Sequence, residues 1–430
     1  MSALDHRTGR HRDRGTVKPA GAASAHGHGH GHGPAPPSSH RVKMLLAAVL
    51  IPIALATLVG LWLTWPGAQP HSGVDIGLGQ RPVQGDVLTA TSAPCTTGGA
   101  GVGRTGSAGQ DKRCISLSVR LTDGDSPGVM IQQVLPDEPS TPRFAVGDQV
   151  VLGYTGGDPS DSASYQIQDF QRGASMLWLA TLFAAAVLLL GRWRGLASLA
   201  ALGFSFLVLV TYLFPAILTG GNPVIVGVLA ASVIMFGVLY LTHGVSAQTS
   251  SAVLGTVLSL ALIGLLGTAF SAATQLTGLD DDTAKLIGVL GHGIDARGLL
   301  LAGMLIGALG VLDDVTVTQT SSVWELRRAN PDLGARQLYT AALRIGRDHI
   351  SSAVNTLALA YTGAVLPVLL LFSLSGQSFG TLVTTQDVAQ EVVRTLVGSI
   401  GLVAAVPITT AIAALVARHD TIESTAPQGF

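Results

Sequence analysis

Charged residues are scarce in this chain. Asp, Glu, Lys and Arg together make up 12% of its 430 residues, whereas average globular proteins carry about 25%. Hydrophobic residues make up 48% of the sequence, and many of the 53 glycines fall in apolar runs, where small side chains let helices approach closely. The composition excludes an ordinary soluble protein and predicts a mainly α-helical, polytopic membrane protein.

Motifs of nucleotide-driven and hydrolytic enzymes are also missing. The sequence has no G-x-x-x-x-G-K-[ST], H-E-x-x-H or G-x-S-x-G pattern. We therefore expect no enzymatic activity and no cofactor. The net charge of −1 gives no support to a nucleic-acid partner. The expected partners are the lipid bilayer and an unknown small substrate or ion, and the sequence does not indicate an oligomeric state.

Cysteine is nearly absent, since the chain contains two cysteines, Cys95 and Cys114. Both lie in one polar segment between apolar spans. Outside the cell they would form a disulfide, which for a loop of this length is worth about 3 kcal/mol. The alternative is a pair of free thiols, which the expected outward location of the segment disfavours.

The chain begins with a polar tail, residues 1–43, whose composition cannot bury a core and predicts disorder. Basic residues are followed by histidines that alternate with glycine: His26, His28, His30 and His32. Neutral imidazoles bind zinc, nickel or copper loosely. A flexible tail with incidental metal affinity is favoured over a dedicated metal site.

About eight apolar spans are predicted. The first, 44–65, is longer than the apolar part of a signal peptide and is interpreted as an uncleaved signal anchor. Seven more form a membrane domain over 175–418, at about 175–191, 196–218, 224–242, 252–273, 298–318, 350–373 and 395–417. Lys and Arg gather in alternate connections, which predicts a multi-pass protein of the cell membrane with both termini, including the tail 419–430, in the cytoplasm.

The polar segment 66–174 is expected to form a small extracytoplasmic β domain with the shape of a short barrel. Runs of alternating polarity at 114–121, 128–134, 144–152 and 165–169 are separated by Gly, Pro and Asp, which is typical of strands joined by turns. Gly147-Asp148 is interpreted as a turn between strands.

Two adjacent carboxylates, Asp313 and Asp314, interrupt the apolar run that begins at Gly298. At a rise of ~1.5 Å per residue, Asp313 lies roughly 22 Å along this helix, inside a hydrocarbon core of about 30 Å. A carboxylate at the centre of a membrane helix costs about 2.5 to 3.5 kcal/mol, so the pair needs a partner, a water-filled cavity or a function. Adjacent helix positions point about 100° apart, and repulsion between two close carboxylates favours proton binding by one of them.

Hydroxyl groups continue from this pair along the same helix. We interpret Asp313, Asp314, Thr316 and Thr318 as a proton or cation relay. The alternative is that the helix ends near Leu312 and that water at the membrane surface solvates both aspartates. The apolar pattern continues through Val315 and Val317, which favours the relay.

The segment 321–347 mixes apolar positions with Arg and Glu. It predicts a cytoplasmic hairpin of amphipathic helices on the membrane, with Pro331 at a helix start, whereas the plainer alternative is a charged loop. Arg344, Arg347 and Asp348 follow at the mouth of the next span, where either arginine is a candidate ion-pair partner of the Asp pair. Asn355 and Tyr361 are polar residues within that span, and helix packing is at least as good an explanation for them as substrate contact.

In the outer connection before Gly298, Asp280 is interpreted as the cap of a short interfacial helix rather than as a calcium ligand.

Three stretches together resemble the YibE/F family of bacterial multi-pass membrane proteins. The first comprises Gly307-Ala-Leu-Gly-Val-Leu-Asp-Asp-Val-Thr-Val-Thr-Gln319 and Ser322-Val-Trp-Glu-Leu-Arg327. The others are Ala342-Leu-Arg-Ile-Gly-Arg-Asp-His-Ile-Ser-Ser352 and the run from Arg394 to Thr410. The resemblance covers about 175–418 and implies an integral membrane protein of unestablished activity, sometimes supposed to be a transporter. The His-rich tail is not part of the pattern.

A shorter similarity concerns the glycine-rich helix that ends in Val-Leu-Asp-Asp-Val, which is similar to the proton-relay helix of resistance–nodulation–division exporters. Two hypotheses follow. The first is a proton-coupled secondary transporter or exporter that uses Asp313 or Asp314. The second is a membrane scaffold or sensor without transport activity, whose outer β domain binds a ligand.

Overall fold

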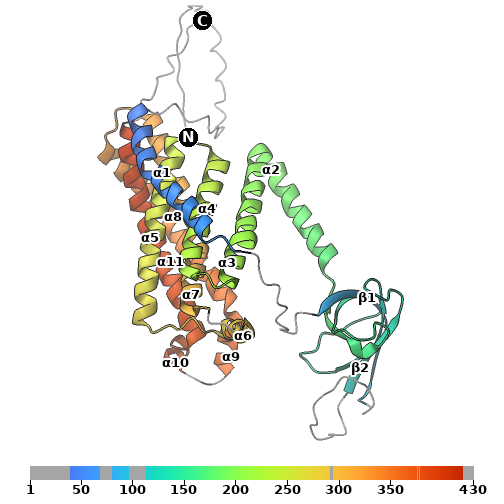
Figure 1. The fold of residues 1–430 in the computed structure, drawn as a ribbon. Coiled ribbons are helices and arrows are strands. Elements are labelled where there is room, and N and C mark those ends of the chain that lie inside the picture. Colours follow the sequence, from blue (N-terminus) through green and yellow to red (C-terminus); the bar gives the residue numbers. More distant parts are fainter. Residues whose placement is uncertain are drawn as a thin grey trace, which may run out of the picture. The chain divides into compact units, whose positions relative to one another are not determined.

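The computed structural model describes residues 39–67, 80–95, 113–290, 294–374, 376 and 378–419. These residues form a bundle of helices and a small curled β-sheet, as Figure 1 shows. The predicted fold class, a helical membrane protein with a small β domain, is therefore confirmed. The histidines 26, 28, 30 and 32 lie outside the described residues, as does most of each predicted tail.

The helices have these bounds: α1 His40–Leu63, α2 Gly173–Val208, α3 Phe214–Leu218, α4 Pro223–His243, α5 Ala247–Ala273, α6 Asp281–Leu290, α7 Ala296–Ala329, α8 Ala335–Ala364, α9 Leu366–Leu374, α10 Phe379–Val383 and α11 Gln386–Arg418. A π-helical turn, Leu209–Leu213, joins α2 to α3. Asp280 Oδ1 accepts a hydrogen bond from Thr283 N (2.7 Å) at the start of α6, which confirms the predicted cap.

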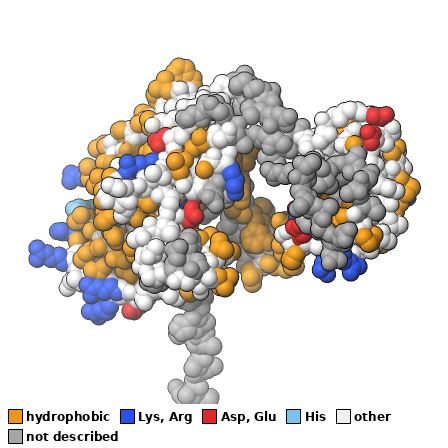
Figure 2. Space-filling model, turned by 90° about the horizontal axis from the view of Figure 1, so that it is seen from below, with side chains coloured by type: hydrophobic (Ala, Val, Ile, Leu, Met, Phe, Trp, Pro, Cys, Tyr) orange, Lys and Arg blue, Asp and Glu red, His pale blue; other side chains and the backbone are white. Residues whose placement is uncertain are grey.

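Six of the described helical segments are long and apolar enough to cross a membrane: α1, α2 together with α3, α4, α5, α7 and α11. Large apolar side chains cover much of the helix surface, and Lys and Arg side chains project at its edge (Figure 2). The sequence predicts about eight spans, and the difference has two causes. The predicted spans 175–191 and 196–218 are two helical arms on either side of a kink at Arg192, and the six segments count them once. The predicted span 350–373 is divided between α8 and α9, with polar residues along α8.

A sharp bend at Arg192 divides α2 into two arms. Its backbone angles (φ 51°, ψ −126°) are uncommon for a residue other than glycine. A Cβ atom at position 195 would lie 2.3 Å from the backbone oxygen of Val187, so the close approach of the arms requires the glycine found there. The bend falls between the predicted spans 175–191 and 196–218, which are the two arms of this segment.

The start of α1 and the end of α11 meet at one end of the bundle, where Ser39 Oγ donates a hydrogen bond to the backbone oxygen of His419 (3.0 Å). Buried residues from α1, α5, α7, α8 and α11 pack together there: Val42, Leu46, Ala247, Val323, Trp324, Leu338, Ala342, Ala413, Ala414 and Ala417. We call this the tail end of the bundle. The chain therefore enters α1 and ends α11 at the same end of the bundle.

Helices α7 and α8 form a hairpin at the tail end, joined by residues 330–334. The side chain of Arg327 holds this turn, since it donates hydrogen bonds to the backbone oxygens of Pro331 and Leu333. The predicted helical hairpin is present, but Pro331 lies in the turn and α8 begins at Ala335. The expectation that Pro331 starts a helix was wrong.

Five antiparallel strands form the β domain: β1 Arg81–Pro94, β2 Arg113–Leu121, β3 Met130–Pro136, β4 Gln149–Tyr154 and β5 Tyr165–Phe170. Their order is β3-β2-β1-β4-β5. Gln133 Nε2 donates to the backbone oxygens of Ser162 and Tyr165, at 2.9 Å each, and so links the two edge strands and curls the sheet. The interior holds apolar side chains from alternate positions: Val83, Val87, Leu117, Val119, Leu121, Ile131, Val150 and Leu152.

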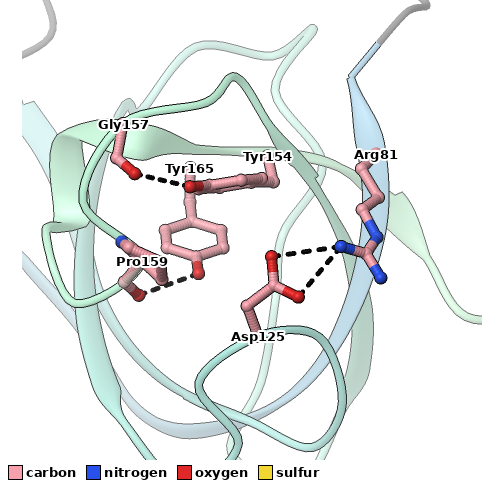
Figure 3. Close-up of polar contacts among 6 residues, drawn as sticks. All are labelled: Arg81, Asp125, Tyr154, Gly157, Pro159 and Tyr165. Carbon is pink, nitrogen blue, oxygen red and sulfur yellow. Dashed lines mark hydrogen bonds and ion pairs between the residues drawn. The ribbon is translucent and has the colours of Figure 1, made fainter.

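Strand β1 is tied down at both ends. Arg81 Nη1 lies 2.9 Å from a carboxylate oxygen of Asp125 at one end (Figure 3). Beyond the other end, Cys95 and Cys114 form a disulfide with their Cα atoms 5.0 Å apart. The long strand in the middle of the sheet is thus held at its two ends to the loop after β2 and to the start of β2.

Two tyrosines shape the connection between β4 and β5. The rings of Tyr154 and Tyr165 lie 5.2 Å apart, and their hydroxyls donate to the backbone oxygens of Gly157 (2.6 Å) and Pro159 (2.8 Å), as Figure 3 shows. Burial raises the pKa of the Tyr165 phenol, so this group stays a hydrogen-bond donor at neutral pH. Farther back along the chain, Asp148 Oδ2 accepts from Ala145 N (2.7 Å), which confirms the predicted turn at Gly147-Asp148.

Candidate functional site

Helix α7 carries the Asp pair and continues far beyond it. The helix runs from Ala296 to Ala329 without a break, so the alternative in which it ends near Leu312 is wrong. Asp313 lies roughly 26 Å along the helix at ~1.5 Å per residue. Val315, directly after the pair, is 2% exposed and packs with Leu402 and Val406 of α11. The pair therefore belongs to the interior part of a long membrane helix.

The two aspartates face different surroundings. Asp313 is half-buried, and its Oδ1 atom is buried with no hydrogen-bond partner among the described residues. The Asp314 side chain is 77% exposed, and its Oδ2 lies 3.8 Å from His349 Nε2 on α8. This divergence agrees with the angle of about 100° between successive helix positions.

Hydroxyl and amide groups form a buried layer one turn beyond Asp313. Thr316 is completely buried, and its Oγ1 lies 2.9 Å from Thr256 Oγ1 on α5. Gln319 is also completely buried and accepts a hydrogen bond at Oε1 from Thr410 Oγ1 on α11 (3.0 Å). We call Thr256, Thr316, Gln319 and Thr410 the polar layer. It lies between three of the membrane helices.

Glycines bring the helices close to this layer. A Cβ atom at Gly346 of α8 would lie 2.7 Å from the amide atoms of Gln319. A Cβ atom at Gly255 of α5 would lie 2.3 Å from Thr409 Oγ1. Small residues thus allow α5, α7, α8 and α11 to surround the polar side chains tightly.

Several polar atoms around the layer have no protein partner. Among the described residues, Gln319 Nε2 and Thr409 Oγ1 are buried without a hydrogen bond, as is Asp313 Oδ1. Buried polar groups are almost always hydrogen-bonded, to protein or to water. Among the described residues, these three atoms are exceptions to that rule.

Thr318 and the predicted ion-pair partners lie elsewhere. Thr318 is half-buried, and its hydroxyl makes no hydrogen bond within the described ranges. The side chains of Arg344, Arg347 and Asp348 are exposed and form no ion pair among the residues that the structure describes. The group that approaches Asp314 is instead His349, because it projects from the side of α8 next to α7.

Asn355 and Tyr361 occupy different faces of α8. Asn355 is exposed, whereas Tyr361 is half-buried with its hydroxyl 3.1 Å from the position that a Cβ atom would take at Gly307. The small residue in α7 therefore makes room for the tyrosine. Neither side chain belongs to the polar layer.

A second charged pair lies near the start of α11. Arg394 Nη1 is 2.6 Å from Glu391 Oε1, and the two side chains are 26% and 17% exposed. Glu391 Oε2 and Arg394 Nε are buried without partners in the described part of the chain. The sequence did not reveal this pair, because the last span was predicted to begin at 395, whereas α11 already begins at Gln386.

The polar layer was also only partly predicted. Thr316 was named, but Thr256 and Thr410 were not, since single hydroxyl residues are common in apolar helices. The residue that could have revealed the layer in the sequence was Gln319, a large amide in an apolar helix six residues after Asp313.

No group of three or more His, Cys, Asp or Glu side chains suited to a metal ion occurs among the described residues.

A comparison with family models identifies a match over residues 179–419 to the family described as YibE/F-like protein. The matched region extends from the first arm of α2 to the end of α11 and includes the Asp pair, the polar layer and the Glu391–Arg394 pair. The searches against curated proteins and against solved structures gave no match.

Proposed function

The chain belongs to the YibE/F-like protein family, and from this premise we propose that it is a proton-coupled membrane transporter in which Asp313 takes up and releases the proton. The observation that carries the proposal is the buried Asp313 Oδ1 atom, which has no hydrogen-bond partner among the described residues. A carboxylate within a membrane helix costs about 2.5 to 3.5 kcal/mol, which a structural role without a partner does not offset.

The proton explains the missing partner. A protonated carboxyl group is neutral, which removes most of the cost of its burial, and it becomes a hydrogen-bond donor. The charged form requires water or a cation at the same place. Asp313 therefore suits a site that alternates between two occupied states during a transport cycle.

The polar layer supplies a route from Asp313 towards the tail end. Thr316 Oγ1 donates a hydrogen bond to the backbone oxygen of Asp313 (3.2 Å) and also lies 2.9 Å from Thr256 Oγ1, where either hydroxyl can be the donor. Hydroxyl groups both donate and accept hydrogen bonds, so in this proposal the two threonines take part in the proton path, with water between them and the Asp313 carboxylate. Gln319 and Thr320 continue the polar positions in the same direction.

We further propose that the tail end faces the cytoplasm in the cell membrane. Most Lys and Arg residues of the described helices lie at or near that end: Arg41, Lys43, Arg327, Arg328, Arg336, Arg344, Arg347 and Arg418. The positive-inside rule assigns such an end to the cytoplasm. A proton bound at Asp313 would then reach the cytoplasm through the polar layer.

The experiment measures proton flux into liposomes that contain the purified chain and a trapped pH-sensitive dye. A potassium gradient with valinomycin drives the flux. We expect Asp313→Asn to abolish it, because the amide cannot release a proton. Asp332→Asn is the matched control, since Asp332 is an exposed carboxylate in the turn after α7.

Asp314→Asn separates the two members of the pair and should retain most of the flux. Equal proton flux in wild-type protein, Asp313→Asn and the double variant would refute the proposal. Correct insertion of each variant is checked by the elution profile of the purified protein.

A further inference from the structure

One face of α8 carries polar and charged side chains that remain exposed. The exposed positions recur every three or four residues and therefore form one stripe along the helix. They are Thr340, Arg344, Arg347, Asp348, Ser351 and Asn355. We call these six residues the α8 stripe.

Part of the α8 stripe lies beside the apolar interior of the bundle. On the opposite face of α8, Ile350 and Ala353 pack against a cluster that contains Val315 of α7. Ser351 and Asn355 are therefore level with the apolar parts of the neighbouring helices. Without a cover, their polar groups would face hydrocarbon, which offers no hydrogen bonds.

Apart from Thr340, whose hydroxyl donates to backbone oxygens of its own helix, the side chains of the stripe have no hydrogen-bond or ion-pair partner among the described residues. Arg344, Arg347, Asp348 and Asn355 form no side-chain hydrogen bond or ion pair with any described residue. The long side chains of Arg344 and Arg347 could extend their guanidinium groups to the lipid headgroups. The short side chains of Asp348 and Asn355 cannot reach the headgroups in this way, and Asn355 lies about two helical turns beyond Asp348.

We propose that the α8 stripe is the contact surface for a second copy of this chain, related to the first by a two-fold axis along the membrane normal. Such an axis leaves every residue at its own depth and turns the two stripes to face each other, so that one edge of each stripe lies opposite the other edge of its copy. Arg347 of each copy then lies level with Asp348 of the other, so two ion pairs form. The Asn355 amides meet near the axis, where each can both donate and accept a hydrogen bond.

The charge pattern favours a second copy over a different partner. Arg347 and Asp348 place opposite charges next to each other, so the surface is complementary to itself after a two-fold rotation. A partner of another kind would require no such balance. The inference does not depend on proton transfer, because Asp313 lies on α7 and is not part of the stripe.

Cysteine cross-linking in native membranes tests the proposal. The two natural cysteines are bonded to each other, so an introduced cysteine supplies the free thiol. We expect Asn355→Cys and Ser351→Cys to give a disulfide-linked dimer after oxidation with copper phenanthroline. Val228→Cys is the matched control, since it lies on an exposed apolar face of α4 and should stay monomeric.

Charge reversal provides the second measurement. Arg347→Asp puts like charges across the axis and should abolish the Asn355→Cys cross-link, and adding Asp348→Arg to the same chain should restore it. Two outcomes would overturn the proposal. One is reaction of both thiols with a charged, water-soluble thiosulfonate and no cross-link, which indicates a water-filled surface. The other is that the thiols react neither with the thiosulfonate nor with each other, which indicates contact with lipid.

Discussion

Replacing Gly255 with alanine tests whether the helices around the polar layer are as close as the structure indicates. A Cβ atom at this position would lie 2.3 Å from Thr409 Oγ1 and 3.0 Å from Thr409 Cβ and Cγ2. Thr409 is completely buried and has no room to move outward. The added methyl group therefore has to push α5 and α11 apart.

The size of the effect follows from two opposing contributions. Overpacking a close-packed interior costs about 1 to 3 kcal/mol. Alanine gains about 1 kcal/mol over glycine through its helix propensity. The net change for Gly255→Ala is thus a loss of about 0 to 2 kcal/mol.

Gly264→Ala in the same helix is the matched control. Its Cβ atom would lie 3.7 Å from Leu305 Cδ2, which is an ordinary contact, so the variant keeps the gain of about 1 kcal/mol. The two variants should differ by about 1 to 3 kcal/mol, and each kcal/mol shifts the midpoint by about 2 to 4 °C for a domain of 150 to 250 residues.

The assay is thermal unfolding of the purified variants in one detergent, followed by circular dichroism. Gly255→Ala should unfold at a lower temperature than Gly264→Ala. Adding Thr409→Ala to the first variant removes the closest atom and should recover part of the loss. Equal midpoints for the two glycine variants would show that α5 and α11 are farther apart than described.

Two further predictions concern single contacts. In a double-mutant cycle of Thr256→Val and Thr316→Val, the coupling energy should be about 0.6 kcal/mol, which is the average for hydrogen bonds between membrane helices. A coupling energy of zero would contradict the contact between the two hydroxyls. Cys114→Ser should destabilise the β domain by about 3 kcal/mol, so that hydrogen exchange of β1 and β2, measured by mass spectrometry, becomes faster while that of α5 stays the same. Unchanged exchange in β1 would mean that the disulfide contributes nothing to the stability of the domain.

The strands with regular alternation were predictable, and β1 was not. Runs of alternating polarity predicted the bounds of β2, β3 and β5 to within about two residues, whereas the run predicted for β4 began several residues before the strand does. The longest strand, β1, contains Pro82 and Gly85, and its register shifts between Val87 and Thr89. Because of these features, β1 lacks the regular alternation of polar and apolar residues that predicts a strand. Its strand conformation depends on pairing with both β2 and β4, which single-sequence patterns do not reveal.

The number of spans depended on local features that hydropathy does not encode. The boundary near residue 192 was predicted correctly as a change of direction, but not as a bend within one helical segment. The full length of α7 was underestimated, because charged residues after Thr320 suggested an end. Contacts of Val323 and Trp324 at the tail end, where both are buried, keep that part helical.

The candidate site was predictable where a single residue carried the signal. The cost of a carboxylate in a membrane helix pointed to Asp313, and the helix period predicted that its neighbour faces elsewhere. The partner of Gln319 is Thr410, 91 residues later in the sequence. Such a pairing depends on which helices pack together, so it required the fold.

The hydrogen bond from Ser39 to His419 makes the membrane domain suitable for circular permutation. The positions where the chain enters and leaves the bundle are adjacent, since Ser39 Oγ lies 3.0 Å from the His419 oxygen. A short peptide joining them, with new ends opened in the exposed turn at 330–334, should leave every helix in place. In a permuted chain of this kind, α8 would be synthesised first and α7 last.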